Sequence, residues 1–99
     1  MIYQIELHPY AQDELAESYQ WYEERLEGLG SRFFAAIQKK FDSIMLSPQL
    51  YPKKKGNYRE VSVKDFPFTI IYEVLEKQKI VFVSYVFHTK RDPRLKYKR

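Results

Sequence analysis

The chain has no cysteine among its 99 residues, which excludes disulfides, thiol catalysis and the common zinc-ribbon frameworks. It has only two histidines and no cluster of carboxylates at ligand spacing, so we expect neither a metal site nor a cofactor. The longest apolar stretch, Ile80 to Phe87, is interrupted by Ser84 and is far too short to span a bilayer. No signal peptide is visible before the first acidic segment. These absences predict a soluble, cytoplasmic protein that does not enter a membrane.

Positive and negative charges are unevenly distributed along the chain. Residues 1–27 carry seven acids and one base, a net charge of −6, whereas residues 28–99 carry sixteen bases and six acids, a net charge of +10. The chain is therefore acidic over its first quarter and basic over the rest. Such an asymmetry indicates an anionic partner on the basic side, although solvated charged faces and a basic tail would give the same composition.

The first half of the chain predicts one strand and two helices. Residues 3–7 alternate apolar and polar side chains, the pattern of a half-buried strand, and Pro9 suits the first turn of a helix. Two apolar stripes at helical spacing follow, separated by Gly28-Leu29-Gly30 and closed by Ser47-Pro48. So short a link predicts an antiparallel helical hairpin. The first stripe contains Leu15, Tyr19, Tyr22, Leu26 and Leu29, and the second contains Phe33, Ile37, Phe41 and Ile44.

The second half predicts three strands. Residues 50–57 are rich in proline, glycine and lysine and are expected to form a loop. Strands are expected over residues 58–64, from residue 68 to residue 74, and over residues 80–87. The order is therefore β-αα-βββ, an α+β domain in which a helical hairpin packs on one face of a mostly antiparallel four-stranded sheet. We expect residues 1–99 to form this single domain, with a basic C-terminal tail at about residues 90–99.

The last predicted strand is apolar on both of its faces, which indicates a central position in the sheet. Its open face needs a cover, and a partner protein is one candidate, because large exposed apolar patches mark interaction sites. Simple alternation places Ile80, Phe82 and Val86 on one face and Val81, Val83 and Phe87 on the other.

The order of elements and several motifs resemble the RelE/ParE superfamily of bacterial toxins, especially its ParE-like, plasmid-stabilisation branch. The resemblance extends over essentially the whole chain. In the second half it is carried by Phe66-Pro67-Phe68, Ile71-Tyr72, His88, Arg91, Asp92 and Pro93, and in the first half by Tyr22-Glu23, Gly30, Phe33 and Ser47-Pro48.

The resemblance implies a toxin encoded beside a small antitoxin, which wraps the toxin and forms a hetero-oligomer with it. Two activities are known in the superfamily. RelE-like members enter the ribosome and cut messenger RNA with basic residues on their sheet, whereas ParE-like members inhibit DNA gyrase and lack that basic set. Which target the chain acts on is left open at this stage.

The sequence departs from the RelE-like pattern at two positions of that basic set. Arg59 matches the first basic position, but Val61 occupies the second, and Thr69 stands where those nucleases carry an arginine. A metal-independent ribonuclease needs an acid, a base and cations on the phosphate. In that alternative the catalytic residues are His88, Arg59 and Arg91, with the histidine as acid or base.

The primary interpretation is a ParE-like toxin that inhibits gyrase by binding, without catalysis. The alternatives are the ribosome-dependent endonuclease and a non-toxic module that binds an antitoxin or nucleic acid. In the primary interpretation the residues expected to contact the target are grouped at strand ends and in the tail. They are Lys64, His88, Arg91, Arg94, Tyr97 and Arg99.

Overall fold

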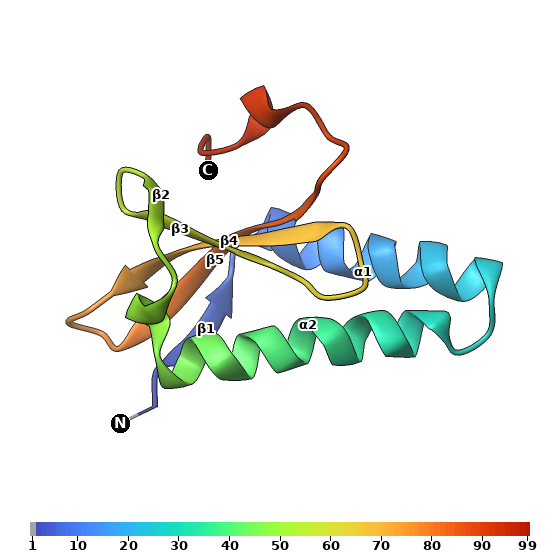
Figure 1. The fold of residues 1–99 in the computed structure, drawn as a ribbon, viewed down its shortest axis with the longest axis horizontal. Coiled ribbons are helices and arrows are strands. Elements are labelled where there is room, and N and C mark those ends of the chain that lie inside the picture. The colour runs from blue at the N-terminus through green and yellow to red at the C-terminus, as the bar shows by residue number, and fades with distance from the viewer. Residues whose placement is uncertain (1) are drawn as a thin grey trace.

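The structure, a computed structural model, describes residues 2–99. Its elements are β1 (Gln4–Leu7), α1 (Pro9–Arg25), α2 (Leu29–Leu46), the 3-10 helix η1 (Pro48–Leu50), β2 (Lys53–Lys55), β3 (Tyr58–Ser62), β4 (Phe68–Leu75), β5 (Ile80–His88) and the 3-10 helix η2 (Pro93–Leu95). The strands form one sheet in the order β1-β5-β4-β3-β2, in which β1 and β5 are parallel and the other neighbouring pairs are antiparallel. The two helices form a hairpin on one face of this sheet (Figure 1). The predicted α+β class is confirmed.

The sheet has five strands rather than the predicted four. The additional strand, β2, lies inside residues 50–57, which were predicted to be a loop, and pairs with β3 at the edge of the sheet. All of its side chains are exposed lysines. A strand without apolar alternation gives no periodic signal, and lysine is typical of edge strands because it discourages pairing with another chain. The middle strand of the sheet is β4, and β5 lies between β4 and β1.

Helix α1 begins where the sequence predicts and ends earlier. Pro9 occupies its first turn, and the Nδ1 atom of His8 accepts a hydrogen bond from the backbone N–H of Tyr10 at 3.0 Å, which caps the helix. The helix ends at Arg25, so Leu26 lies beyond it and is 58% exposed. The predicted apolar stripe is therefore correct up to Tyr22 and wrong at Leu26. None of the helices within residues 2–99 is long and apolar enough to cross a membrane.

Helix α2 supplies the apolar side of the hairpin. All four predicted residues of its stripe, Phe33, Ile37, Phe41 and Ile44, are buried against the sheet. Its first turn is capped by a side chain of α1, because the carboxylate of Glu23 accepts hydrogen bonds from the backbone N–H groups of Gly28 and Gly30. Both bonds are 2.9 Å long. A carboxylate at this position also complements the positive end of the helix.

Strand β5 contains a bulge at Ser84. Tyr72 of β4 pairs with Val83, and the preceding residue, Ile71, pairs with Tyr85, which leaves Ser84 without an opposite residue. Ser84 is fully buried, and its hydroxyl has no hydrogen-bond partner among residues 2–99. A bulge of this kind bends the strand and changes the direction of the side chains that follow it.

The bulge overturns the simple alternation predicted for β5. Val86 faces the helices with Val81 and Val83, although the alternation places it on the other side. Phe87 faces the opposite side of the sheet with Tyr85 and Ile71. One extra residue thus creates a small aromatic cluster on the face away from the helices.

Tyr72 makes the stability of the fold depend on pH in the alkaline range. Its hydroxyl is buried and donates a 2.6 Å hydrogen bond to the carbonyl of Pro48, and burial raises its pKa from 10.0 to about 12. A raised pKa stabilises the fold below pH 10, and this contribution is lost as the pH rises through 12. We expect the free energy of unfolding to fall by about 2 kcal/mol more over this range than in Tyr72→Phe, which has no ionisable group there.

Denaturant titrations at several pH values measure this difference. Tyr10→Phe serves as the matched control, because it removes the same hydroxyl from an exposed position outside the core. Equal alkaline slopes for the wild type and for Tyr72→Phe would contradict the prediction.

Candidate functional site

Residues 89–99, which we call the strap, leave the end of β5 and fold back over the face of the sheet opposite the helices (Figure 1). Beneath the strap lie Ile71, Tyr85 and Phe87, each no more than 1% exposed. Tyr97 of the strap packs against this cluster. The apolar open face that the sequence predicts is therefore covered by the chain itself in this structure.

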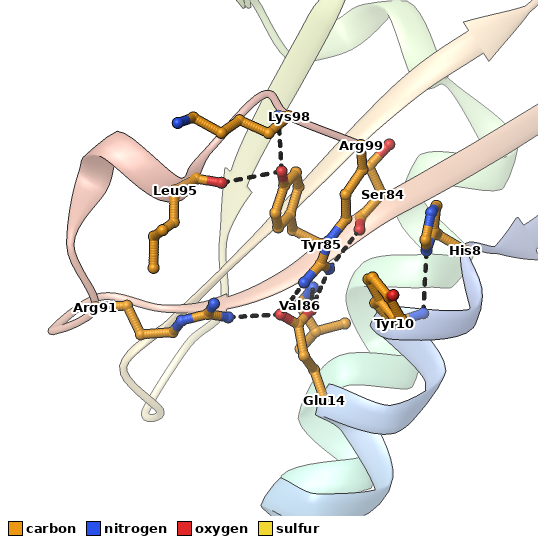
Figure 2. A network of polar contacts seen from close by, with 10 residues as sticks. All are labelled: His8, Tyr10, Glu14, Ser84, Tyr85, Val86, Arg91, Leu95, Lys98 and Arg99. Carbon is orange, nitrogen blue, oxygen red and sulfur yellow. Dashed lines mark hydrogen bonds and ion pairs between the residues drawn. The ribbon is translucent and has the colours of Figure 1, made fainter.

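Tyrosine hydroxyls tie the strap to the sheet. The hydroxyl of Tyr85 donates to the carbonyl of Leu95 at 3.0 Å and accepts from the backbone N–H of Lys98 at 2.8 Å (Figure 2). The hydroxyl of Tyr58, on β3, donates to the backbone carbonyl of Arg99 at 2.7 Å. These bonds join residues that are far apart in sequence, so they depend on the folded sheet.

Two carboxylates complete the attachment. Glu60 of β3 accepts a hydrogen bond from the hydroxyl of Tyr97 and lies 3.5 Å from the ammonium group of Lys96. Burial, followed by the hydrogen bond to Glu60, raises the pKa of Tyr97 to about 12. Tyr97 is therefore protonated at neutral pH and acts as the donor in this contact.

Glu14 of α1 is the second carboxylate and the centre of the polar network (Figure 2). Its oxygens accept from Arg91 at 2.6 Å, from both terminal nitrogens of Arg99 at 2.9 Å, and from the backbone N–H of Val86 at 3.0 Å. The guanidinium of Arg99 also donates to the carbonyl of Ser84 at 2.8 Å and lies 4.0 Å from the ring centroid of Tyr85. Such charge-assisted bonds are the stronger ones in proteins.

This network closes an edge of β5 that no strand covers. Strand β1 ends at Leu7, which pairs with Val83, and His8 then donates to the carbonyl of Val83. Beyond this point Glu14 accepts from the backbone N–H of Val86 and Arg99 donates to the carbonyl of Ser84. The strap and α1 thus take the place of a missing strand, as backbone groups at a buried edge require.

A cavity of about 960 Å³ lies between α1, the end of β5 and the strap. Carboxylates of α1 form one wall, and groups from β5 and the strap, among them His88 and Lys90, form another. Tyr22 and Phe68 add apolar surface. The cavity therefore has acidic, basic and aromatic walls. Its charged residues are Asp13, Glu14, Glu17, Lys90, Arg91 and Arg99.

His88 and Lys64 lie near the same end of the sheet. Nδ1 of His88 accepts from the backbone N–H of Lys90 at 3.0 Å, and its ring packs edge-on against Phe68, with centroids 5.0 Å apart. Lys64 is exposed in the turn between β3 and β4. That turn is joined to the strap by the bond from the N–H of Thr89 to the carbonyl of Pro67.

The remaining predicted contact residues belong to the strap and differ in accessibility. Arg94 is the most accessible, with 88% of its side chain exposed, and pairs with Asp92 at 2.7 Å. The bond from Arg94 also lowers the pKa of Asp92. Arg91, Tyr97 and Arg99 are instead held by Glu14 or Glu60.

The three candidate nuclease residues do not converge on one point. Arg59 donates to the carbonyls of Gln49 and Tyr51, so its guanidinium is engaged with the segment after α2. Arg59 pairs with Tyr72 of β4, whereas His88 pairs with Phe68. These two positions on β4 are four residues apart, about 13 Å along the strand.

Sequence reasoning missed the residues that hold the strap: Glu14, Glu60, Tyr58 and Tyr85. Glu14 looked like one of many solvated acids on α1, and the tyrosines looked like ordinary strand residues. The excess of acid in the first helix and of base in the tail was the available signal, because it allows the two to attract one another.

The family model for the ParE toxin of type II toxin–antitoxin systems, parDE, matches residues 5–93. This chain belongs to the ParE toxin family. It is accordingly a toxin of the RelE/ParE superfamily of type II toxin–antitoxin systems. No curated protein sequence is a significant match.

Solved structures agree with this ParE-family fold at low sequence identity. The ParDE system of P. aeruginosa matches with a TM-score of 0.75 at 11% identity, covering 90% of this chain and 98% of the other. The isolated E. coli RelE toxin matches with a TM-score of 0.70 at 20% identity, covering 93% and 89%. The E. coli RelBE toxin–antitoxin complex matches with a TM-score of 0.70 at 18% identity, covering 90% and 99%.

Proposed function

We propose that this ParE-family toxin arrests growth by inhibiting DNA gyrase and is neutralised by a cognate antitoxin. The observation that carries the proposal is the match of the ParE family model to residues 5–93. Inhibition by binding needs no catalytic group. It needs side chains of the right charge gathered at one surface, and the end of the sheet and the strap supply them.

The cationic contact surface combines residues from the turn before β4, the end of β5 and the strap. Lys64 and Arg94 are exposed, and His88, at the end of β5, is partly exposed. Arg91, Tyr97 and Arg99 complete the set that we propose for target binding. An anionic surface of the target would complement this group, and such complementarity determines association rate and specificity.

An antitoxin partner is the second part of the proposal. Two of the similar solved structures are a RelBE toxin–antitoxin complex and a ParDE system. We propose that this chain likewise forms a hetero-oligomer with an antitoxin. The affinity of the purified toxin for the product of a short neighbouring reading frame is the direct check.

Pulse-labelling of cells minutes after induction tests the target. We expect thymidine incorporation to stop before methionine incorporation, because gyrase inhibition blocks DNA synthesis first. His88→Ala is expected to weaken the arrest only modestly, since loss of one peripheral contact costs about 1 kcal/mol of binding. If methionine incorporation stops first, the gyrase proposal is wrong.

A messenger-RNA endonuclease is the second candidate, favoured by the RelE-like fold and by His88 lying on a cavity wall with Arg91. In that case His88→Ala would abolish toxicity and leave antitoxin binding intact, because general acid–base catalysis contributes about 10²- to 10⁴-fold. The same two experiments therefore separate the two candidates.

A further inference from the structure

The strap is attached to the domain mainly by polar contacts. Its 3-10 helix η2 contains no buried residue, and Leu95 is 44% exposed. Its attachments are instead the ion pairs to Glu14 and Glu60 and the hydrogen bonds to Tyr58 and Tyr85. A segment with no buried side chain of its own opens at a lower free energy than the core of a domain.

The backbone of the strap is also strained where it crosses the aromatic cluster. Tyr97 has a φ of 66°, in the left-handed region that bulky side chains rarely adopt. Such a conformation persists only when surrounding contacts hold it, and here those contacts are Glu60 and the aromatic ring of Tyr58. The closed strap therefore contains strain that opening relieves.

Closure engages several of the groups that we propose for target binding. Arg91 and Arg99 share Glu14, while Lys96 and Tyr97 share Glu60. Closure also buries Tyr85 and Phe87, and exposed aromatic residues beside arginines are typical of protein interfaces. Opening would release both the cations and the aromatic surface together.

We propose that the strap is an autoinhibitory element, which Glu14 and Glu60 hold closed and which must open before the toxin engages its target. The inference rests on the proposed function, because it assigns a regulation to the same contact surface. Glu14 and Glu60 are positioning residues here: they hold the strap and do not themselves contact the target. The strap residues Arg91, Tyr97 and Arg99 bind the target only in the open form.

Hydrogen exchange of the purified protein measures strap opening. We expect Glu14→Gln to speed exchange in residues 89–99 by about 10- to 100-fold, because it removes the carboxylate charge and one of the two oxygens that accept from Arg91 and Arg99. The amide oxygen of this variant can still accept from Val86. Glu60→Gln loosens the second attachment without touching α1. Glu24→Gln is the matched control, since it removes the same charge from an exposed position of α1.

Growth arrest measures the consequence. We expect Glu14→Gln and Glu60→Gln to arrest growth at an inducer dose about three- to tenfold lower than the wild type, because a larger open population raises the apparent affinity for the target. Glu24→Gln should match the wild type in both assays. Protection of the β4 amides from hydrogen exchange confirms that each variant is folded. If one of the two variants does not fold, the other alone tests the proposal.

The outcomes separate this inference from the proposed function. Faster exchange with unchanged or weaker arrest overturns autoinhibition and leaves the gyrase proposal intact. Unchanged exchange in both variants also overturns it, because the carboxylates then do not hold the strap. Stronger arrest through inhibition of translation supports the strap and refutes gyrase as the target. Absence of arrest in the wild type and in every variant refutes both.

Discussion

Removal of residues 94–99 is expected to reduce growth arrest by about 100-fold or more, since truncating charged contacts costs about 2–5 kcal/mol in binding. The deletion removes Arg94, Tyr97 and Arg99, three of the six proposed contact residues. The expected change in growth arrest has the opposite sign to that for Glu14→Gln, which frees Arg99 without removing it. The inducer dose that arrests growth measures both effects in one assay.

The deletion also uncovers Tyr85 and Phe87, so a control must separate lost contacts from lost stability. The variant Arg94→Gln removes one proposed contact cation from an exposed side chain and keeps the strap's hydrogen bonds to Tyr85. We expect it to unfold at the wild-type temperature and to arrest growth about tenfold less effectively. Full toxicity of the deletion variant would contradict the proposed contact surface.

Local patterns in the sequence account for most of the fold. The spacing of Phe33, Ile37, Phe41 and Ile44 predicts the buried side of α2, because residues three and four apart share a helix face. His8 with Pro9 predicts the start of α1. These features depend on neighbours within one or two turns, so a single sequence contains the necessary information.

The bulge and the fifth strand depend on pairing between strands, which no local pattern reveals. Ser84 becomes the extra residue of β5 only through the register of β5 against β4. Lysines 53–55 become strand β2 only because β3 lies beside them. A run of three lysines and an isolated serine in an apolar strand are equally compatible with other structures.

Some features of the candidate site are likewise visible in the sequence, and others depend on the complete fold. The sequence predicts that the tail is cationic, and the structure pairs one of its arginines, Arg94, with Asp92. Which of the other cations are accessible depends on Glu14, which lies 77 residues from Arg91 and 85 from Arg99. A contact over that separation requires the complete fold, so the sequence predicts the charges of the strap but not its closed position.

The second large effect is expected for Gly30→Ala, which should destabilise the fold by about 3 kcal/mol, the upper end for overpacking a tight contact. A Cβ atom at this position would lie 2.8 Å from the backbone oxygen of Tyr19 and 2.9 Å from Oε1 of Glu23. Backbone of α1 cannot move aside cheaply, and displacement of Glu23 would also remove the cap of α2. For a domain of this size, 3 kcal/mol lowers the melting temperature by about 15 °C.

Gly28→Ala is the matched control for this prediction. Gly28 has a φ of +89°, and a Cβ atom added there would meet no atom within 4 Å, so only the backbone conformation opposes the change. We expect it to cost about 1 kcal/mol. The difference between the two variants isolates the close approach of α1 and α2 from the general cost of replacing a glycine.

A double-mutant cycle measures how much of the cost of Gly30→Ala comes from the contact with Glu23. Glu23→Ala alone loses the two bonds to Gly28 and Gly30 and should cost about 1–2 kcal/mol, as the loss of a helix cap does. Combined with Gly30→Ala it should cost less than the sum, because the methyl group then meets one obstacle fewer while Tyr19 still blocks it. Strict additivity would show that the carboxylate does not restrict this position, and a Gly30→Ala cost equal to that of Gly28→Ala would show that the helices do not approach so closely.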